Sequence, residues 1–250
     1  ILAPQSGDMI LAKEGFAKNI YICKLDKLTP LVGTDTTPVS DGLQLWYDFR
    51  NGTVGNNVVT DLSGNDKHAT LSGFAHDATS GYTEDGLLFD TTDDTLTTDD
   101  SFNIGTSDFT IEVTGMIKAA FSAETRNGLF LYENAVFPDT NLRIYTSQHV
   151  SDNGYIRSRG HDDYTNNVDP VLNAILEFNK YFTVTYVRNQ KNFKVYKNGI
   201  QVATQDFEII GNFNTLKPFI AKQINGILRT WRYYNRALTA DEIKQNYVVK

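Results

Sequence analysis

One run of the sequence, residues 141 to 167, concentrates the side chains best suited to binding a polar ligand. It reads NLRIYTSQHVSDNGYIRSRGHDDYTNN. Tyrosine rings can stack on the C–H faces of a sugar, while arginine, histidine, aspartate and asparagine can hydrogen-bond to its hydroxyls. The candidate ligand-binding residues are Tyr145, Tyr155, Arg157, Arg159, His161, Asp162, Tyr164 and Asn166. The alternative is an ordinary solvent-exposed sheet face or polar loop, which would carry a similar mixture of residues.

Nucleophilic and thiol chemistry have little support. Cys23 is the only cysteine, which excludes an internal disulfide framework and a thiolate zinc cluster. It lies between Ile22 and Lys24 in an alternating segment, so a small core residue is the simplest interpretation. No G-x-S-x-G motif accompanies the four histidines, although a Ser-His-Asp triad stays open.

Composition and charge narrow the class of protein. The chain has 250 residues, of which 40% are hydrophobic, which is enough for one large domain or two small ones with a real core. The formal net charge is -7 and the basic residues are spread out, so no nucleic-acid partner is expected. No apolar run approaches the roughly 18 residues that span a bilayer, and no signal-peptide pattern opens the chain. Because the sequence begins at Ile1 without Met, we expect a processed or trimmed product.

The spacing of aromatic residues and turn formers is typical of an all-β sandwich. The chain has 15 Phe and 13 Tyr, and Gly, Asn, Asp and Thr recur roughly every eight to twelve residues. We expect strands at 43–49, 86–90, 109–118, 128–133, 142–147, 155–159, 181–188 and 193–199. In 109–118 and 181–188 the alternation predicts one buried face and one mostly wet face. Asn198-Gly199 predicts a type I′ hairpin at the end of the last of these strands.

The C-terminal region carries the clearest helix signal. Thr239 to Glu242 has the form of a capping box, and Leu238 and Ile243 are spaced for a hydrophobic staple. A helix should therefore begin at about Ala240. Because so short a helix is marginal alone, we expect it to clasp the folded sandwich. The stretch 170–179 is a second, weaker helix candidate.

Residues 1 to 38 differ from the rest of the chain. GDMILAKEG and NIYICKLDKLTPL lead into GTDTTP, whose small polar residues and proline are typical of a linker. We expect an N-terminal attachment segment, or the remnant of a preceding domain, over 1–38. The sandwich domain is then expected over 39–250.

Several blocks occur in the order and spacing of one known superfamily. They are GLQLWYDF (42–49), DLSGNDKHATLSGF (61–74), DGLLFDTTDDTLTT (85–98), DFTIEVTGMIK (108–118), YFTVTYVRNQKNFKVYKNGIQV (181–202) and NGILRTWRYYNRALTADEIKQNY (225–247). Together they resemble the laminin-G-like jelly-roll branch of the concanavalin A-like lectin/glucanase superfamily. The resemblance implies an all-β fold: a two-sheet antiparallel jelly-roll sandwich, concanavalin A-like, with a short C-terminal helix against its edge.

The catalytic branch of that superfamily offers a direct test. Its members carry E-x-D-x-x-E or E-x-D-x-E on one strand, because period-two spacing places two carboxylates on one face about 5 Å apart. No such run occurs here. Glu112 and Glu133 stand alone, and Glu242 is explained by capping. We therefore expect no enzymatic activity.

The resemblance also bears on metal binding. Relatives often hold a structural calcium with hard oxygen ligands, and Asp48, Asp61 and Asn65 fall in the matching blocks. Many relatives, however, read G-x-I-D-D before the last strand, where this chain has Arg229 and Thr230. Structural calcium is one expectation, and an Asx-rich turn shaped by Asp61 and Asn65 is the alternative.

Three hypotheses of function remain. The first is a non-catalytic carbohydrate-binding or adhesion module on a phage head, tail fibre or bacterial surface, with glycans or host polysaccharide as partners. The second is a purely structural virion decoration or fibre protein, joined to other virion proteins, and to itself as a homotrimer, through 1–38. The third is a secreted glycan hydrolase with an acid pair that the sequence does not reveal. All place the chain on a virion, on a cell surface or outside the cell.

Overall fold

The computed structural model describes most of the chain beyond residue 36. The described residues are 37–90, 93–98, 104–118, 126–131, 141–147, 155–161, 172–208, 210, 219–222 and 224–248. In 126–131, 141–147 and 155–161 the description covers the backbone alone. The predicted segment 1–38, with Cys23, lies outside the described residues except for Thr37 and Pro38.

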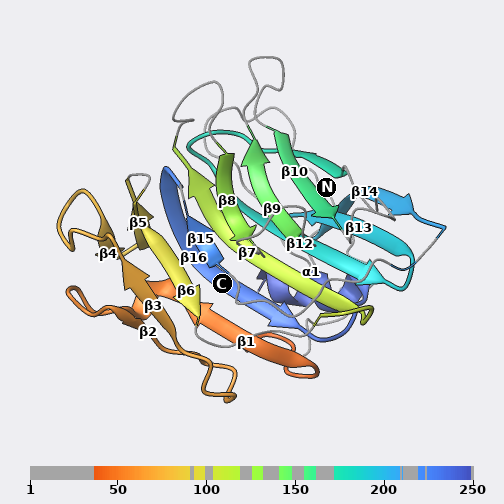
Figure 1. Cartoon of the computed structure of the whole chain (residues 1–250), viewed down its shortest axis with the longest axis horizontal. Coiled ribbons are helices and arrows are strands. Elements are labelled where there is room, and N and C mark those ends of the chain that lie inside the picture. The colour runs from red at the N-terminus through yellow and green to blue at the C-terminus, as the bar shows by residue number, and fades with distance from the viewer. Residues whose placement is uncertain are drawn as a thin grey trace, which may run out of the picture. The chain divides into compact units, whose positions relative to one another are not determined.

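The described strands form two antiparallel sheets (Figure 1). Sheet A runs in the order β14 (Ile200–Asp206), β13 (Asn192–Lys197), β12 (Tyr181–Asn189), β7 (Phe109–Ile117), β16 (Gly226–Tyr234), β5 (Gly86–Phe89), β4 (Gly81–Thr83). Its remaining strand, β1 (Leu43–Asp48), pairs with residues 230–234 of β16, beyond the stretch that pairs with β5. Sheet B runs in the order β11 (Leu172–Ile175), β10 (Tyr155–His161), β9 (Asn141–Ser147), β8 (Arg126–Leu131), β15 (Phe219–Lys222), β6 (Thr95–Thr98), β3 (Ala69–Ser72), β2 (Val58–Val59).

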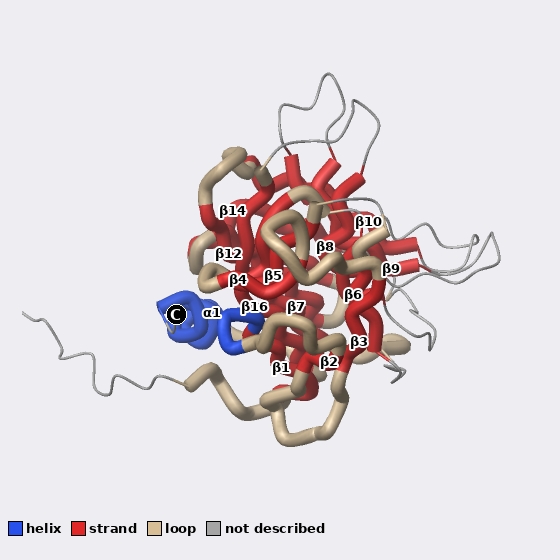
Figure 2. The backbone as a smooth tube through the Cα atoms, turned by 90° about the vertical axis from the view of Figure 1, so that its left-hand side faces the viewer, coloured by secondary structure: helices blue, strands red, loops and turns tan. Residues whose placement is uncertain are grey.

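The helix α1 (Ala240–Val248) adds a third layer. Figure 2 shows α1 on the side of sheet A that faces away from sheet B. The architecture is thus a two-sheet jelly-roll sandwich with a short C-terminal helix, and the expected all-β fold class is confirmed. A short 3-10 turn, η1 (Phe49–Asn51), follows β1. In the described part of the chain no helix is long and apolar enough to cross a membrane.

The main core lies between the sheets and is rich in aromatic residues. Tyr47, Phe49, Phe89, Phe109 and Trp231 each have 0% of their surface exposed. The rings of Tyr47 and Trp231, from neighbouring strands, lie 6.4 Å apart. Burial of such large rings supplies the dominant driving force for a sandwich of this kind.

All the strands expected from the sequence are present, and their bounds lie within two residues of the predicted ones. The hairpin at Asn198-Gly199 is confirmed, since these residues have φ angles of 53° and 76° and Lys197 pairs with Ile200. Positive φ at both central positions is what a type I′ turn requires. The short strands β2, β3, β4, β6 and β15 were not among the predicted ones.

The helix expected at 170–179 is wrong. Residues 172–175 form β11, which pairs with β10 at the edge of sheet B. Ala174 and Leu176, two positions apart, are both buried, which is the period of a strand and not of a helix. Pairing with β10 overrides the local helix preference of this stretch.

The wet face expected for 109–118 and 181–188 is also wrong over most of its length. Thr110 and Glu112 are 0% exposed, and Thr183, Thr185 and Val187 on β12 are buried as well. Alternation does place these residues on the face opposite the main core. That outer face of sheet A is covered, because α1 packs on it (Figure 2).

A second hydrophobic cluster joins α1 to the outer face of sheet A. Its buried members are Val39, Val187, Tyr196, Tyr234, Leu238 and Ile243. Leu238 and Ile243 both belong to it, as the predicted hydrophobic staple requires. The predicted start of the helix at Ala240 is confirmed, and α1 clasps the sheet through Ile243, which is 0% exposed.

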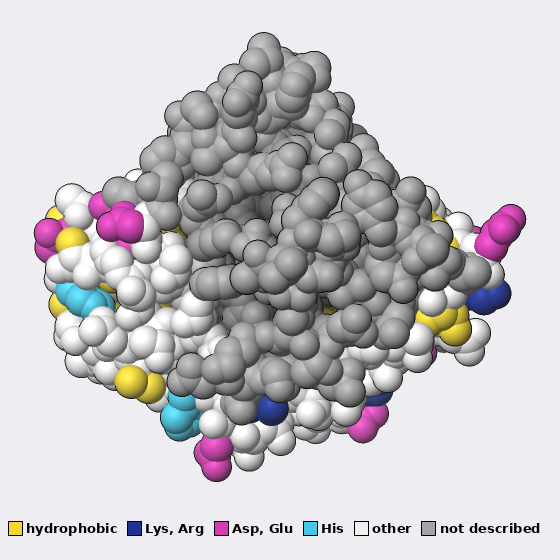
Figure 3. All heavy atoms as spheres, viewed as in Figure 1, with side chains coloured by type: hydrophobic (Ala, Val, Ile, Leu, Met, Phe, Trp, Pro, Cys, Tyr) yellow, Lys and Arg dark blue, Asp and Glu magenta, His cyan; other side chains and the backbone are white. Residues whose placement is uncertain are grey.

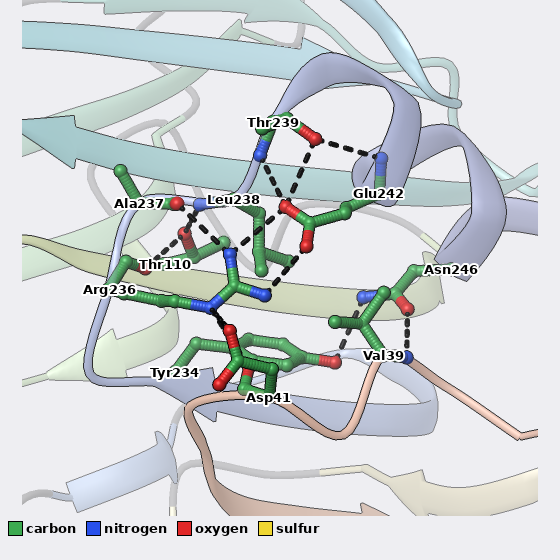
Figure 4. A network of polar contacts seen from close by, with 10 residues as sticks. All are labelled: Val39, Asp41, Thr110, Tyr234, Arg236, Ala237, Leu238, Thr239, Glu242 and Asn246. Carbon is green, nitrogen blue, oxygen red and sulfur yellow. Dashed lines mark hydrogen bonds and ion pairs between the residues drawn. The ribbon is translucent and has the colours of Figure 1, made fainter.

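Polar contacts fix the ends of the clasp (Figure 4). The capping box is closed, with the Thr239 amide donating to Glu242 Oε2 at 2.8 Å and the Glu242 amide donating to Thr239 Oγ1 at 3.3 Å. Arg236 holds the same carboxylate through Nη1 and Nη2, at 3.0 and 2.6 Å. At the far end of α1, Asn246 accepts from the Val39 amide at 2.9 Å and donates to the Tyr234 hydroxyl at 2.9 Å.

Candidate functional site

The sequence-predicted ligand residues that the structure describes lie on two paired strands of sheet B. Tyr145 is in β9, and Tyr155, Arg157, Arg159 and His161 follow one another at alternate positions of β10. The register pairs Arg157 directly with Tyr145. Alternate residues of a strand share one face, so these five positions form one ladder across β9 and β10.

The register of β11 indicates which face of sheet B this ladder occupies. Ile156 pairs with Ala174, which is buried in the main core. The positions next to Ile156 on β10, Tyr155 and Arg157, therefore belong to the face opposite the core. Asp162, Tyr164 and Asn166, the other predicted ligand residues, lie outside the described residues.

The predicted metal ligand Asp61 is engaged by hydrogen-bond donors. Its Oδ1 accepts from the amides of Trp46 and Ser63, both at 2.9 Å. Its Oδ2 accepts from Ser63 Oγ at 2.7 Å and from the Lys67 amide at 3.1 Å. The carboxylate thus organises the turn that follows β2 and ties it to β1, which is the Asx-turn role left open as the alternative.

The other two predicted metal ligands also have protein partners. The Asn65 amide group donates to the Leu43 carbonyl at 3.1 Å and to Ser63 Oγ at 3.0 Å. Asp48 forms an ion pair with Arg50 at 2.6 Å. Among the described residues no group of three or more His, Cys, Asp or Glu side chains is placed to hold a metal ion. Calcium at these positions stays a prediction.

A pocket opens on the outer face of sheet A, beside the C-terminal end of α1. It encloses about 470 Å³ of space that includes its open mouth. We call it the α1 pocket, and its lining residues are Arg50, Thr114, Tyr181, Phe182, Thr183, Asn198, Arg229, Thr230, Asn246 and Tyr247. They come from η1, β7, β12, β16, the β13–β14 turn and α1, so only the folded sandwich brings them together.

Arg50 is held at one side of the α1 pocket by Asp48. Its Nε and Nη2 donate to the two oxygens of Asp48 at 2.8 and 2.6 Å. Burial works to raise the pKa of Asp48, but the hydrogen bonds and charge of Arg50 outweigh it and the pKa is lowered. Asp48 therefore stays ionised at neutral pH and fixes the orientation of the guanidinium.

Arg229 is held in the α1 pocket by an aromatic ring and a carboxylate. Its guanidinium lies 3.5 Å from the centroid of the Tyr181 ring. Its Nη2 donates to Asp85 Oδ1 at 2.7 Å, and its Nε donates to the Asp85 carbonyl at 3.1 Å. Stacking on an aromatic ring and a one-sided ion pair both leave part of a planar guanidinium free for a ligand.

Hydroxyl and amide groups also line the α1 pocket. The Thr114 and Thr183 hydroxyls lie 2.9 Å apart, and Asn198 Oδ1 accepts from the Thr183 amide at 2.9 Å. The Tyr181 hydroxyl is buried, and no group of the described residues lies in hydrogen-bond geometry to it. Burial raises the pKa of the phenol, with smaller opposing effects of the nearby Arg229 and Asp85. A buried hydroxyl without a hydrogen bond normally costs free energy, so a ligand that forms a hydrogen bond with the Tyr181 hydroxyl would be favoured.

The sequence did not predict the α1 pocket. Its residues lie far apart along the chain, and none belongs to the polar run 141–167. The one available signal was the unusual Arg229-Thr230 pair at the place where relatives often carry two acids. In the sequence, Arg229 and Thr230 argue against a calcium site, and in the structure both residues line the α1 pocket.

Comparison with protein-family models found none that matches the chain. A comparison with curated protein sequences likewise found no match. Solved structures do match in fold. A Trypanosoma rangeli sialidase in complex with sialic acid aligns over 82% of this chain and 32% of its own, with 14% identity and a TM-score of 0.58.

Two further solved structures also match in fold. The binding domain of Paraclostridial Mosquitocidal Protein 1 aligns over 83% of this chain and 52% of its own, with 18% identity and a TM-score of 0.54. A mutant of HCR/D aligns over 84% of this chain and 53% of its own, with 16% identity and a TM-score of 0.61. The chain thus spans about a third of the sialidase and about half of the other two proteins. At these low sequence identities, the similarity shows the all-β sandwich fold and not a shared function.

Proposed function

We propose that this chain is a non-catalytic carbohydrate-binding or adhesion module, displayed on a virion or a bacterial surface. The observation that carries the proposal is the ladder on β9 and β10, in which Arg157 pairs with Tyr145 and is flanked by Tyr155, Arg159 and His161. Aromatic and polar residues on one sheet face are the combination that binds sugar rings and their hydroxyls.

The fold of the similar structures supports the proposal. One of them is a sialidase in complex with sialic acid, and another is the binding domain of a mosquitocidal protein. A jelly-roll sandwich hosts many functions, so the fold alone does not select this one. The laminin-G-like resemblance of the sequence, with its non-catalytic branch, favours binding over structure or hydrolysis.

Two of the described acidic residues are unsuited to the acid pair of an ordinary glycosidase. Most glycoside hydrolases use two accessible carboxyl groups, one of them with a raised pKa, whereas sialidases use a tyrosine nucleophile. Burial and the nearby Asp90 raise the pKa of Asp94 to about 6, but the Asp94 side chain is 0% exposed and a substrate cannot reach it. Glu112 is also 0% exposed and is paired with Arg232 at 2.5 Å.

Display on a surface agrees with the sequence. An acidic chain with no internal disulfide framework and an attachment-like leader at 1–38 fits a virion or bacterial surface protein. On the face drawn in Figure 3, the described acidic and basic side chains are scattered and do not gather into one patch.

The test is glycan-array binding of the purified chain and of two ladder variants, Tyr155→Ala and Arg157→Gln. We expect binding by the wild type and loss in both variants, with unchanged thermal unfolding. Phe178→Ala is a matched control, because Phe178 is an exposed aromatic residue outside the ladder. Ladder variants that bind as the wild type does would overturn the assignment of the site.

A further inference from the structure

We propose that the α1 pocket is a second ligand site, and that it binds an acidic sugar through the sugar's carboxylate and hydroxyls. This inference rests on the proposed carbohydrate-binding function and names a ligand class for it. The pocket lies on the outer face of sheet A, whereas the ladder lies on sheet B. The two sites can therefore be tested independently.

The free polar groups of the α1 pocket are mainly donors. Arg50 donates from Nε and Nη2 to the carboxylate of Asp48, and Arg229 donates from Nη2 to the carboxylate and from Nε to the backbone carbonyl of Asp85. The Nη1 group of each arginine makes no hydrogen bond within the described part of the chain. The Tyr181 hydroxyl is buried and unpartnered. Asn198 uses its carbonyl oxygen for the Thr183 amide, which leaves its amide nitrogen as a further donor. A donor-rich lining selects a ligand rich in acceptors.

Two of those donors are cationic, so the complementary acceptor is an anion. The Arg50 and Arg229 side chains are 30% and 28% exposed, which lets them reach a ligand in the mouth of the pocket. Guanidinium groups recognise carboxylates with charge-assisted hydrogen bonds. Asp85, the partner of Arg229, is 61% exposed, and such surface ion pairs contribute little free energy. A ligand carboxylate can therefore share or replace it.

The hydroxyl groups in the lining of the pocket favour a hydroxylated ligand over a bare anion. The pocket holds about 470 Å³ of space, part of which is open solvent, so its lining and not its volume indicates the ligand class. Thr114, Thr183 and Thr230 line the pocket, and the hydroxyls of the first two are hydrogen-bonded to each other at 2.9 Å. A hydroxyl both donates and accepts, so a row of them matches the hydroxyls of a sugar ring better than the oxygens of an inorganic ion.

The lining is built before any ligand arrives. Asp48 and the Tyr181 ring orient the two guanidinium groups, and Asn246 is fixed at both of its polar ends by Val39 and Tyr234. Preorganised donors lose little conformational entropy on binding. The pocket therefore meets the usual requirement for selective recognition of a small polar ligand.

The experiment titrates the full chain with sodium D-glucuronate, D-glucose and sodium acetate, by calorimetry or NMR. We expect saturable binding of glucuronate and much weaker binding of glucose and acetate. Arg229→Gln should weaken glucuronate binding by about tenfold, through loss of a charge-assisted hydrogen bond. Tyr181→Phe removes only the unpartnered hydroxyl and should weaken it by about threefold without harming the fold.

Lys244→Gln serves as the matched control, because it removes one positive charge from an exposed position of α1 outside the pocket. It should bind glucuronate as the wild type does. The proposal is overturned if glucuronate does not bind, if glucose or acetate binds equally well, or if both pocket variants bind as the wild type does. Array binding that persists, and that still depends on Arg157, would show that the pocket proposal alone has failed.

Discussion

The two ends of the outer face of sheet A carry similar polar residues. They differ in how many hydrogen bonds and ion pairs those residues form within the protein. At the covered end, Glu112 is 0% exposed and is bound by Arg232 at 2.5 Å and by the Thr185 hydroxyl at 3.1 Å. At the open end, the α1 pocket, Arg229 keeps a free Nη1 group and Tyr181 an unpartnered hydroxyl. One end of the face is closed by internal pairing, and the other presents its polar groups.

The difference teaches that burial of a polar face need not indicate a binding site. At the covered end the charges of Glu112 and Arg232 are paired with each other, although the buried Arg232 Nε makes no hydrogen bond, and such polar groups stabilise the fold or fix its register. Where the helix ends, similar groups are left with spare donors beside an open space. The contrast predicts large stability effects at the covered end and small ones at the open end.

The largest expected effect comes from breaking the buried ion pair. Glu112→Ala leaves Arg232 buried without its partner, and we expect a loss of about 3–5 kcal/mol in the free energy of unfolding. Urea unfolding followed by circular dichroism measures it. Replacing both partners, with Glu112→Leu and Arg232→Met, should restore most of the loss. A single variant that loses less than about 1 kcal/mol would contradict the account of the covered end.

The next effect comes from truncating the anchor of α1. Ile243 is 0% exposed between the helix and sheet A. Ile243→Ala should lower the free energy of unfolding by about 2–5 kcal/mol through lost burial and the cavity left behind. Lys244→Ala, at the exposed neighbouring position, is the control and should stay within about 0.5 kcal/mol of the wild type. Equal effects of the two changes would show that α1 does not clasp the sheet.

A smaller effect should appear at acidic pH. Hydrogen bonds from Arg236 lower the pKa of Glu242 to about 2, so the stability it contributes is present above the ordinary value of 4.5 and is lost as the pH falls towards 2. Because the pair is partly exposed and screened by solvent, we expect less than about 1 kcal/mol. Unfolding curves of the wild type and Glu242→Gln between these pH values measure it. A difference between the two proteins that grows as the pH falls would contradict the prediction.

The smallest effect on stability belongs to the open end. Tyr181→Phe removes a hydroxyl that has no partner, so the free energy of unfolding should change by no more than about 0.5 kcal/mol. Thermal or urea unfolding measures it. A loss comparable to that of Glu112→Ala would mean that the hydroxyl serves the fold, and the contrast between the two ends would disappear.

Local signals in the sequence predicted the parts of the fold that depend on local chemistry. The Thr239 cap and the Asn198-Gly199 turn each concern residues close together in the chain, and the structure confirms both. Five of the predicted ligand residues lie on one face of β9 and β10, because alternate positions on paired strands come together. Their role in ligand binding stays a prediction.

Features that depend on contacts between distant segments could not be predicted from the sequence, because local patterns do not show which segments meet. The outer face of β7 was expected to be wet because alternation reveals two faces but not what covers them, and here α1 covers one end. The stretch 172–175 became a strand because β10 offered an edge to pair with. The α1 pocket brings Arg50, Tyr181 and Arg229 together from distant strands, and no local pattern links them.

The central claim is that this sandwich recognises carbohydrate, and the most direct measurement is binding of the intact, folded chain to a broad array of neutral and acidic glycans. The account predicts binding to a subset that includes acidic glycans, with loss of binding in Tyr155→Ala or Arg157→Gln. A folded chain that binds no glycan on such an array would contradict it.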